Sequence, residues 1–182
     1  METTTIRAIE TRCFGYRFRS RLEARWATFF QSLGVDWRYE PEGFDFGDIL
    51  YLPDFWIRFP EMRQRPYPEG MPPERGFWVE IKPTVPSDAE CTRCELLSHA
   101  SGHCVYLVAG NIGGDYRVTK WHPRSGRLPD RAAFGLDWLL SYLVSDAIPE
   151  NHTSGDHSDP YGLRSAFMAA RSARFEFGEH GQ

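Results

Sequence analysis

The chain lacks a long apolar run, an excess of positive charge and a cysteine-rich pattern, and each absence excludes a class of protein. No stretch stays apolar over the length that a bilayer requires, and the N-terminus has no apolar signal-peptide region. Four cysteines in a chain of 182 residues are too few for a disulfide-held scaffold. We therefore expect a cytoplasmic protein with reduced cysteines and no membrane association.

The chain does contain enough apolar and aromatic residues to build one sizeable core. Hydrophobic residues make up 41% of it and aromatic residues 15%, which separates it from disordered chains. The net charge of −4 excludes a general polycation, although a local basic surface is enough to bind nucleic acid. A solvated helix face is the alternative for such a surface. The arginines that we predict to contact a nucleic-acid backbone are Arg17, Arg19, Arg21, Arg171 and Arg174.

Helical periodicity and capping signals predict four helices. Ser20 to Leu33 has apolar residues at helical spacing, and Ser20 with Glu23 matches a capping box. Ser87 repeats this pattern and predicts a second helix through about His99. The remaining two predicted helices run from Phe134 to Val144 and from Leu163 to Phe175.

Five apolar segments predict strands, and their order predicts the topology of the sheet. The first three follow one another and can form an antiparallel meander, whereas the helix before the fourth predicts a crossover to a parallel strand. The predicted fold class is therefore α/β, with a mixed central sheet and flanking helices. The segments are Trp37 to Phe46 with a kink at Pro41, Tyr51 to Phe59, Phe77 to Lys82, Cys104 to Ala109 and Tyr116 to Trp121.

Composition divides the chain into four parts. Residues 1–17 are a polar N-terminal segment with a short ordered piece around Cys13 to Tyr16, and residues 18–148 are the main domain. Residues 149–160 have the composition of a linker, and residues 161–182 are a C-terminal helix and tail. A Pro-rich, charged loop is predicted from Phe59 to Gly76, between the second and third strands.

Three charged residues interrupt the apolar strands and give the strongest functional signal. Asp54 follows Pro53 in one apolar run, and Glu80 and Lys82 lie two residues apart in the next. Residues two apart in a strand point to one face, so Glu80 and Lys82 share a face with Trp78. An unpaired buried charge is unfavourable, and a divalent metal together with a phosphate would provide partners for all three.

The oxygen atoms of Asp54, Glu80 and the Ile81 carbonyl suit Mg²⁺ or Mn²⁺. A bound metal would lower the pKa of a water molecule and offset negative charge on a phosphate under attack. Lys82 could orient that water or stabilise the developing charge, and Glu23 of the first helix could bind a second metal or position water. Each residue alone also has an ordinary alternative: a Pro-Asp turn, a solvated Glu-x-Lys pair and a helix cap.

In these motifs the chain resembles the PD-(D/E)XK nuclease superfamily, which has the restriction-endonuclease-like fold. Pro53-Asp54 and Glu80-Ile81-Lys82 match its motif, and Glu23 matches the acid of the preceding helix. The resemblance covers residues 18 to about 121. It implies an αβββαβ core and Mg²⁺-dependent or Mn²⁺-dependent hydrolysis of phosphodiester bonds. The metal ligands would be Asp54 and Glu80, with Lys82 catalytic and Glu23 assisting.

The same resemblance indicates an endonuclease that acts on DNA, with RNA not excluded. The run from Tyr51 to Ile57 is similar to that of small phage and mobile-element members, and the two motifs together are similar to the TnsA-type transposon endonuclease subunit. A homodimer or a partner protein is compatible with the acidic composition. The alternative is a catalytically silent or partner-dependent nucleic-acid-binding subunit of a larger complex.

A second cluster of chemically reactive residues offers a different interpretation. Cys91 and Cys94 lie three residues apart, and His99 and Cys104 follow them, so the four could hold Zn²⁺. However, no second Cys-x-x-Cys is present, and cysteine also serves as a small apolar residue. The pattern favours buried or surface cysteines, and zinc binding stays open.

Overall fold

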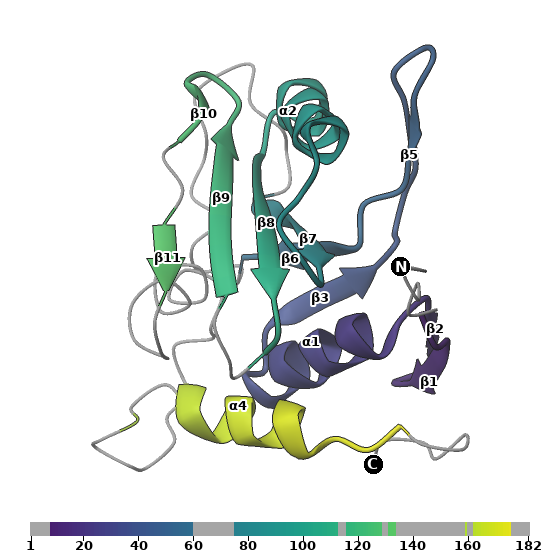
Figure 1. The fold of residues 1–182 in the computed structure, drawn as a ribbon, viewed down its shortest axis with the longest axis vertical. Helices are drawn as coiled ribbons and strands as arrows, with labels where there is room; N and C mark the ends of the chain where they lie inside the picture. The colour runs from purple at the N-terminus through teal and green to yellow at the C-terminus, as the bar shows by residue number, and fades with distance from the viewer. Residues whose placement is uncertain are drawn as a thin grey trace, which may run out of the picture.

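The computed structural model describes residues 8–59, 75–112, 116–128, 131–133, 159 and 162–175, and these ranges form an α/β fold (Figure 1). The helices are α1 (Arg21–Ser32), α2 (Asp88–Ser101) and α4 (Leu163–Ser172). The sheet contains β3 (Asp36–Tyr39), β6 (Phe55–Arg58), β7 (Gly76–Lys82), β8 (Cys104–Gly110), β9 (Tyr116–His122), β10 (Gly126–Arg127) and β11 (Arg131–Ala133). Two hairpins lie outside it: β1 (Thr11–Cys13) with β2 (Tyr16–Phe18), and β4 (Phe44–Asp45) with β5 (Leu50–Tyr51).

The sheet has the strand order β10-β9-β8-β7-β6-β3, with β11 also paired to β9. Strands β3, β6 and β7 form the predicted antiparallel meander. Helix α2 then crosses over to β8, which pairs parallel to β7, also as predicted. The predicted fold class, a mixed central sheet with flanking helices, is therefore confirmed.

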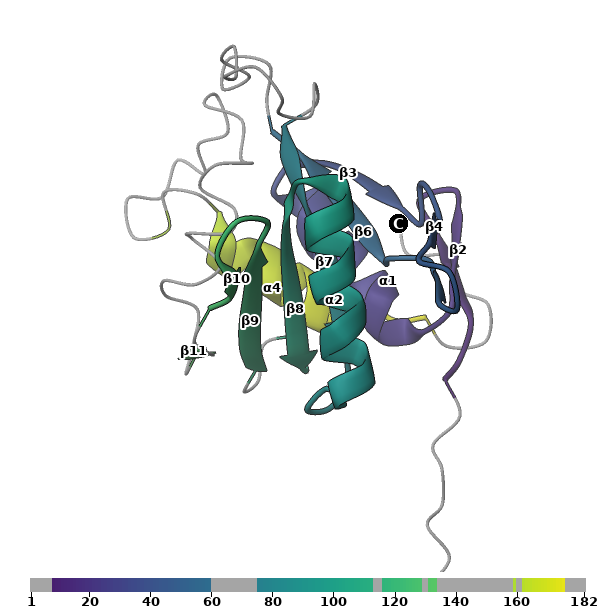
Figure 2. The same cartoon turned by 90° about the horizontal axis from the view of Figure 1, so that it is seen from above.

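Helices cover both faces of the sheet. Helix α2 lies on one face, and α1 and α4 lie on the other, as the view from above shows (Figure 2). Strand β7 supplies both layers because its side chains alternate: Val79 and Ile81 join the core under α1, whereas Trp78 joins the core under α2. The predicted alternation of side chains along this strand is thus confirmed.

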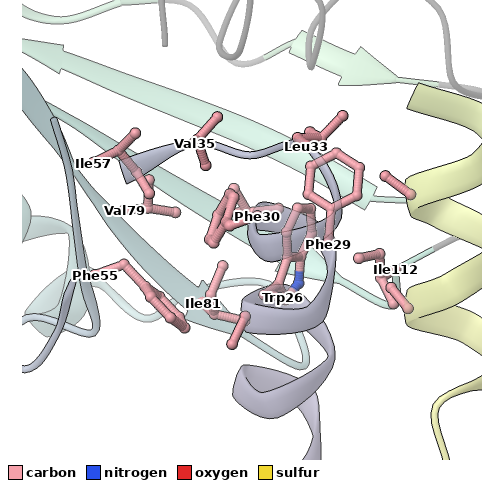
Figure 3. Close-up of a cluster of buried hydrophobic side chains, with 14 of the residues drawn as sticks. Trp26, Phe29, Phe30, Leu33, Val35, Phe55, Ile57, Val79, Ile81 and Ile112 are labelled. Carbon is pink, nitrogen blue, oxygen red and sulfur yellow. The ribbon is translucent and has the colours of Figure 1, made fainter. Parts of the chain in front are cut away.

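The core under α1 is largely aromatic. Three residues of α1 that recur at helical spacing, Trp26, Phe29 and Phe30, face the sheet (Figure 3). Phe29 also contacts Phe167 of α4, with ring centroids 4.7 Å apart. Helix α4 therefore shares this core with α1, and it ends at Ser172, three residues before the predicted end.

Helices α1 and α2 begin at the predicted capping residues. The Ser20 hydroxyl accepts a hydrogen bond from the Glu23 N–H, and Ser87 and Glu90 form a complete capping box. Helix α2 ends at Gly102, whose φ of 70° is the left-handed conformation that glycine adopts without strain. These local signals fix where the helices start.

Two predicted strands are wrong as single elements. The segment from Trp37 to Phe46 breaks after Tyr39, where Glu40 takes a φ of 46° and turns the chain out of the sheet. The segment from Tyr51 to Phe59 breaks at Pro53 and Asp54, because proline has no N–H to donate to a neighbouring strand. The residues between the two breaks form the separate β4–β5 hairpin.

The N-terminal segment contains a hairpin where only a short ordered piece was predicted. Strands β1 and β2 are joined by Phe14 and Gly15, which both have positive φ, at 51° and 78°. A two-residue loop of this kind matches the twist of an antiparallel pair. Cys13 and Phe18 from this hairpin are buried in the core under α1.

Several predictions fall on residues outside the described ranges. They are the helix from Phe134 to Val144, residues 60–74 of the predicted loop, and the predicted linker at residues 149–160. Asp159 is the one residue of that linker that the structure describes. Among the residues that are described, no helix has the length and apolar character needed to cross a membrane.

Gly76 lies at the start of β7, and a substitution there tests how closely β6 and β7 pack. A Cβ atom there would lie 2.3 Å from the Ile57 carbonyl oxygen and 2.5 Å from a ring carbon of Trp56. We expect Gly76→Ala to lower the free energy of unfolding by about 1–3 kcal/mol, because backbone and a buried indole must shift. In Gly43→Ala, the matched control, the nearest atom is 3.8 Å away, and we expect a change within about 0.5 kcal/mol. Equal denaturant midpoints for the two variants would contradict this packing.

Candidate active site

The site lies where β6 separates from β7. The ladder between them ends at the pair Phe55–Val79, whereas β7 continues to Lys82. The edge of β7 beyond Val79 therefore has no β6 partner. The Asp54 side chain takes that place, and its Oδ2 accepts a hydrogen bond of 2.8 Å from the Ile81 N–H. Asp54 is only 1% exposed, so the break in the strand places a carboxylate inside the protein.

A second hydrogen bond links the same two segments, and here the backbone of Asp54 donates to the side chain of Glu80. Its Oε2 accepts the Asp54 N–H at 3.3 Å and the Tyr51 hydroxyl at 2.7 Å. Its other oxygen, Oε1, lies 2.6 Å from the Lys82 ammonium. The Asp54 carboxylate is thus held by the backbone N–H of Ile81, and the Glu80 carboxylate by the backbone N–H of Asp54. The predicted trio of Asp54, Glu80 and Lys82 does come together.

Lys82 lies on the α2 face of the sheet between two acids. Besides Glu80, its Nζ lies 3.8 Å from Glu90 in the first turn of α2. Burial by itself would lower the pKa of Lys82, but the carboxylates of Glu80 and Asp54 outweigh it and raise the pKa above its usual value. Lys82 therefore stays a charged donor at neutral pH, and it keeps a part of its side chain in contact with solvent.

The buried carboxylates carry an unfavourable concentration of negative charge. Burial and the charge of Glu80 raise the pKa of Asp54 well above its usual value, and Lys82 and the Ile81 N–H offset this only in part. Burial and Glu80 also raise the pKa of Tyr51, so its hydroxyl stays protonated and donates to Glu80. The site consequently favours additional positive charge.

Glu23 lies beside this pair but is held by other groups. Its Oε1 accepts the Ser20 hydroxyl, and its Oε2 accepts the Tyr39 hydroxyl at 2.5 Å and the Arg19 N–H at 3.1 Å. Its negative charge contributes to the raised pKa of Asp54, so the two carboxylates are close enough to interact. Glu23 therefore holds the segment around the Ser20 cap in place and adds negative charge to the site.

One of the five predicted nucleic-acid-binding arginines joins the site directly. The Arg19 guanidinium spans two acids, with Nη2 2.6 Å from Asp54 Oδ1 and Nε 2.6 Å from Glu40 Oε1. The other four arginines lie elsewhere. Arg17 pairs with Glu10 on the exposed β1–β2 hairpin, Arg21 is the first residue of α1, and Arg171 and Arg174 are exposed at the end of α4 and just after it.

Sequence analysis did not identify Tyr39, Glu40 or Tyr51 as site residues. Tyr39 pairs with Phe55 across β3 and β6, which brings Tyr39 and Glu40 next to Asp54. That register is a long-range property, and no motif in the sequence reveals it. Tyr51 had a usable signal, because it lies three residues before Asp54 in the same apolar run.

The donor atoms at this site fit a hard divalent cation. In a strand, the N–H and C=O of one residue point to the same edge, so the Ile81 carbonyl shares the edge at which its N–H meets Asp54. No three Asp, Glu, His or Cys side chains in the described ranges cluster as a metal site. Binding of Mg²⁺ does not require such a cluster, because two carboxylates, a carbonyl and waters can complete its coordination. Burial and the neighbouring charge of Glu80 raise the pKa of Asp54, and added positive charge nearby would lower it.

The cysteine and histidine set does not gather into a zinc site within the described part of the chain. Cys94 is a buried residue of α2 with its Sγ 4.0 Å from the Tyr51 hydroxyl, and burial raises the pKa of its thiol. His99 is exposed, and Cys91 and Cys104 are partly buried and not in a disulfide. Cys94 therefore serves as an apolar core residue, as the sequence favoured.

No protein-family model matches the chain, and no curated protein or solved structure matches it. The function is therefore inferred from the chemistry of Asp54, Glu80 and Lys82 and from the order of the elements that carry them.

The raised pKa of Asp54 predicts how the metal-free protein responds to pH. Native Asp54 keeps its proton above the usual pKa of 3.8, so the native state binds more protons than the unfolded chain in that range. Stability should then fall as pH rises, by at most about 1.4 kcal/mol per pH unit. We expect this fall to be smaller in Asp54→Asn than in the wild type, measured by denaturant unfolding in EDTA between about pH 5 and pH 8.

Asp36→Asn is the matched control for this comparison, because Asp36 is exposed and pairs with Arg58 on the surface. It should retain the pH dependence of the wild type. Parallel curves for the wild type and Asp54→Asn would show that Asp54 ionises normally in the native state.

Proposed function

We propose that this protein is a divalent-metal-dependent nuclease that hydrolyses phosphodiester bonds in DNA. One observation carries the proposal: two buried carboxylates, Asp54 and Glu80, meet at the free edge of β7 with the charged Lys82 beside them. Buried acids that lack sufficient positive charge favour a cation, and a lysine at the same place favours an anionic substrate.

The residues that would hold Mg²⁺ or Mn²⁺ are Asp54, Glu80 and the carbonyl of Ile81. When bound, such a metal lowers the pKa of a coordinated water and offsets negative charge on the phosphate. The hydrogen bonds that Asp54 and Glu80 accept from each other's strands keep both carboxylates in place before any cation arrives. This pre-organisation lowers the entropy that metal binding would otherwise lose.

Lys82 would act on the water or on the phosphate. Its raised pKa keeps it protonated at neutral pH, which suits the stabilisation of negative charge and the orientation of a water by hydrogen bonding. It would not serve as a general base in that state. The two oxygens of Glu80 have different partners: the Tyr51 hydroxyl donates to Oε2, and the Lys82 ammonium donates to Oε1.

The order of elements supports the same reading. Helix α1, the antiparallel strands β3, β6 and β7, helix α2 and the parallel strand β8 follow the αβββαβ order that the resemblance to PD-(D/E)XK nucleases implies. On that resemblance the enzyme is an endonuclease, similar to those of phages and mobile elements. Its acidic composition is compatible with a homodimer or a partner protein.

A cleavage assay with a matched pair of lysine variants tests this function. Supercoiled plasmid, linear duplex and single-stranded DNA are incubated with protein in Mg²⁺, in Mn²⁺ and in EDTA. We expect cleavage with either metal and none in EDTA. Lys82→Met, which keeps the apolar stem and removes the charge, should reduce the rate about a hundredfold or more.

Lys120→Met is the control, because Lys120 is the other lysine of the chain and lies over the Tyr106 ring on a different pair of strands. It should cut at the rate of the wild type. If the wild type binds DNA but cuts none of the three substrates with either metal, the catalytically silent or partner-dependent subunit is the better reading. Equal loss in both lysine variants would point to folding and not to the site.

A further inference from the structure

Arg19 occupies the solvent side of the Asp54 carboxylate. Asp54 Oδ2 is engaged by the Ile81 N–H, and Arg19 Nη2 lies 2.6 Å from the remaining oxygen, Oδ1. A dication at Asp54 would therefore meet the positive charge of the guanidinium at close range, where the repulsion between like charges is strong. Arginine stays protonated across the ordinary pH range, so only a movement of the side chain removes this conflict.

The structure around Arg19 permits such a movement. Its backbone N–H is fixed by the carboxylate of Glu23 and the hydroxyl of Tyr39. Its side chain, in contrast, is 53% exposed and touches Asp54 only through the terminal Nη2. The backbone is thus anchored while the guanidinium remains close to solvent.

A second acid keeps the guanidinium near the site. Glu40 Oε1 lies 2.6 Å from Arg19 Nε, a different nitrogen from the one that meets Asp54. Glu40 has a φ of 46°, an uncommon conformation for a residue other than glycine, and it directly follows β3. The Glu40 N–H donates to the Asp54 carbonyl, which ties this turn to the site.

We infer that Arg19 is a built-in counter-ion that competes with the divalent cation for Asp54. This inference rests on the metal site of the proposed function and names a step that regulates it. In the metal-free protein Arg19 Nη2 occupies Asp54 Oδ1, and on metal binding it gives up that oxygen while Glu40 retains the Arg19 Nε. The released guanidinium would then be available to an anionic substrate near Asp54.

Metal affinity tests the competition without using catalysis. Binding of Mn²⁺ alone is measured by calorimetry at about pH 8, where few protons compete for the carboxylates. We expect Arg19→Gln to bind Mn²⁺ roughly tenfold more tightly than the wild type, because the competing charge is removed. Asp54→Asn should abolish this binding and so identify the site that the calorimeter reports.

Arg58→Gln is the matched control, because Arg58 also pairs with an aspartate, Asp36, at the other end of β6. Its Mn²⁺ affinity should equal that of the wild type. Thermal unfolding in EDTA checks that each variant is folded. If Arg19→Gln does not fold, Arg19→Met takes its place, because methionine keeps an unbranched apolar stem without the charge and should also strengthen Mn²⁺ binding.

The outcomes separate this inference from the function on which it rests. Tighter binding in the Arg19 variant but not in Arg58→Gln supports the competition. Unchanged or weaker binding in the Arg19 variant, with Asp54-dependent binding in the wild type, overturns the competition and leaves the metal site standing. Absence of Asp54-dependent Mn²⁺ binding in the wild type overturns both.

Discussion

The hydrogen bond from the Ile81 N–H to the Asp54 carboxylate is the interaction on which the site depends. It exists because β6 stops pairing at Phe55 while β7 continues, which leaves N–H and C=O groups of β7 without a strand partner. A buried N–H needs an acceptor, and the side chain of Asp54 provides it. The same break therefore completes the hydrogen bonding of the sheet and buries an acid that, with Glu80, has a strong preference for positive charge.

The site contains two ion pairs, one within a single strand and one between distant segments of the chain. Glu80 and Lys82 come from one strand and share a face, so their pairing follows from the geometry of β7. Asp54 and Arg19 come from distant segments and meet through an exposed, flexible side chain. A tyrosine hydroxyl also donates to each of the two glutamates: Tyr51 to Glu80 and Tyr39 to Glu23. The acids are consequently held more firmly than the cations that face them.

Features with a local cause could be predicted from the sequence. Ser20 and Ser87 cap helices through neighbouring residues, and the alternation along β7 placed Glu80 and Lys82 together. Features with a distant cause could not. The register between β3 and β6, together with the turn at Glu40, decides that Tyr39 and Glu40 reach Asp54. For the same reason the sequence predicted Arg19 as a nucleic-acid contact but did not reveal its two acidic partners.

Several contacts that assemble the site join residues far apart along the chain. Tyr39 and Glu23 are separated by 16 positions, Ile81 and Asp54 by 27, Tyr51 and Glu80 by 29, and Arg19 and Asp54 by 35. Non-local contacts form only after the chain has closed the intervening loops. No isolated hairpin or helix in the described part of the chain can carry the site, so its acids come together only when α1 has docked on the meander of β3, β6 and β7.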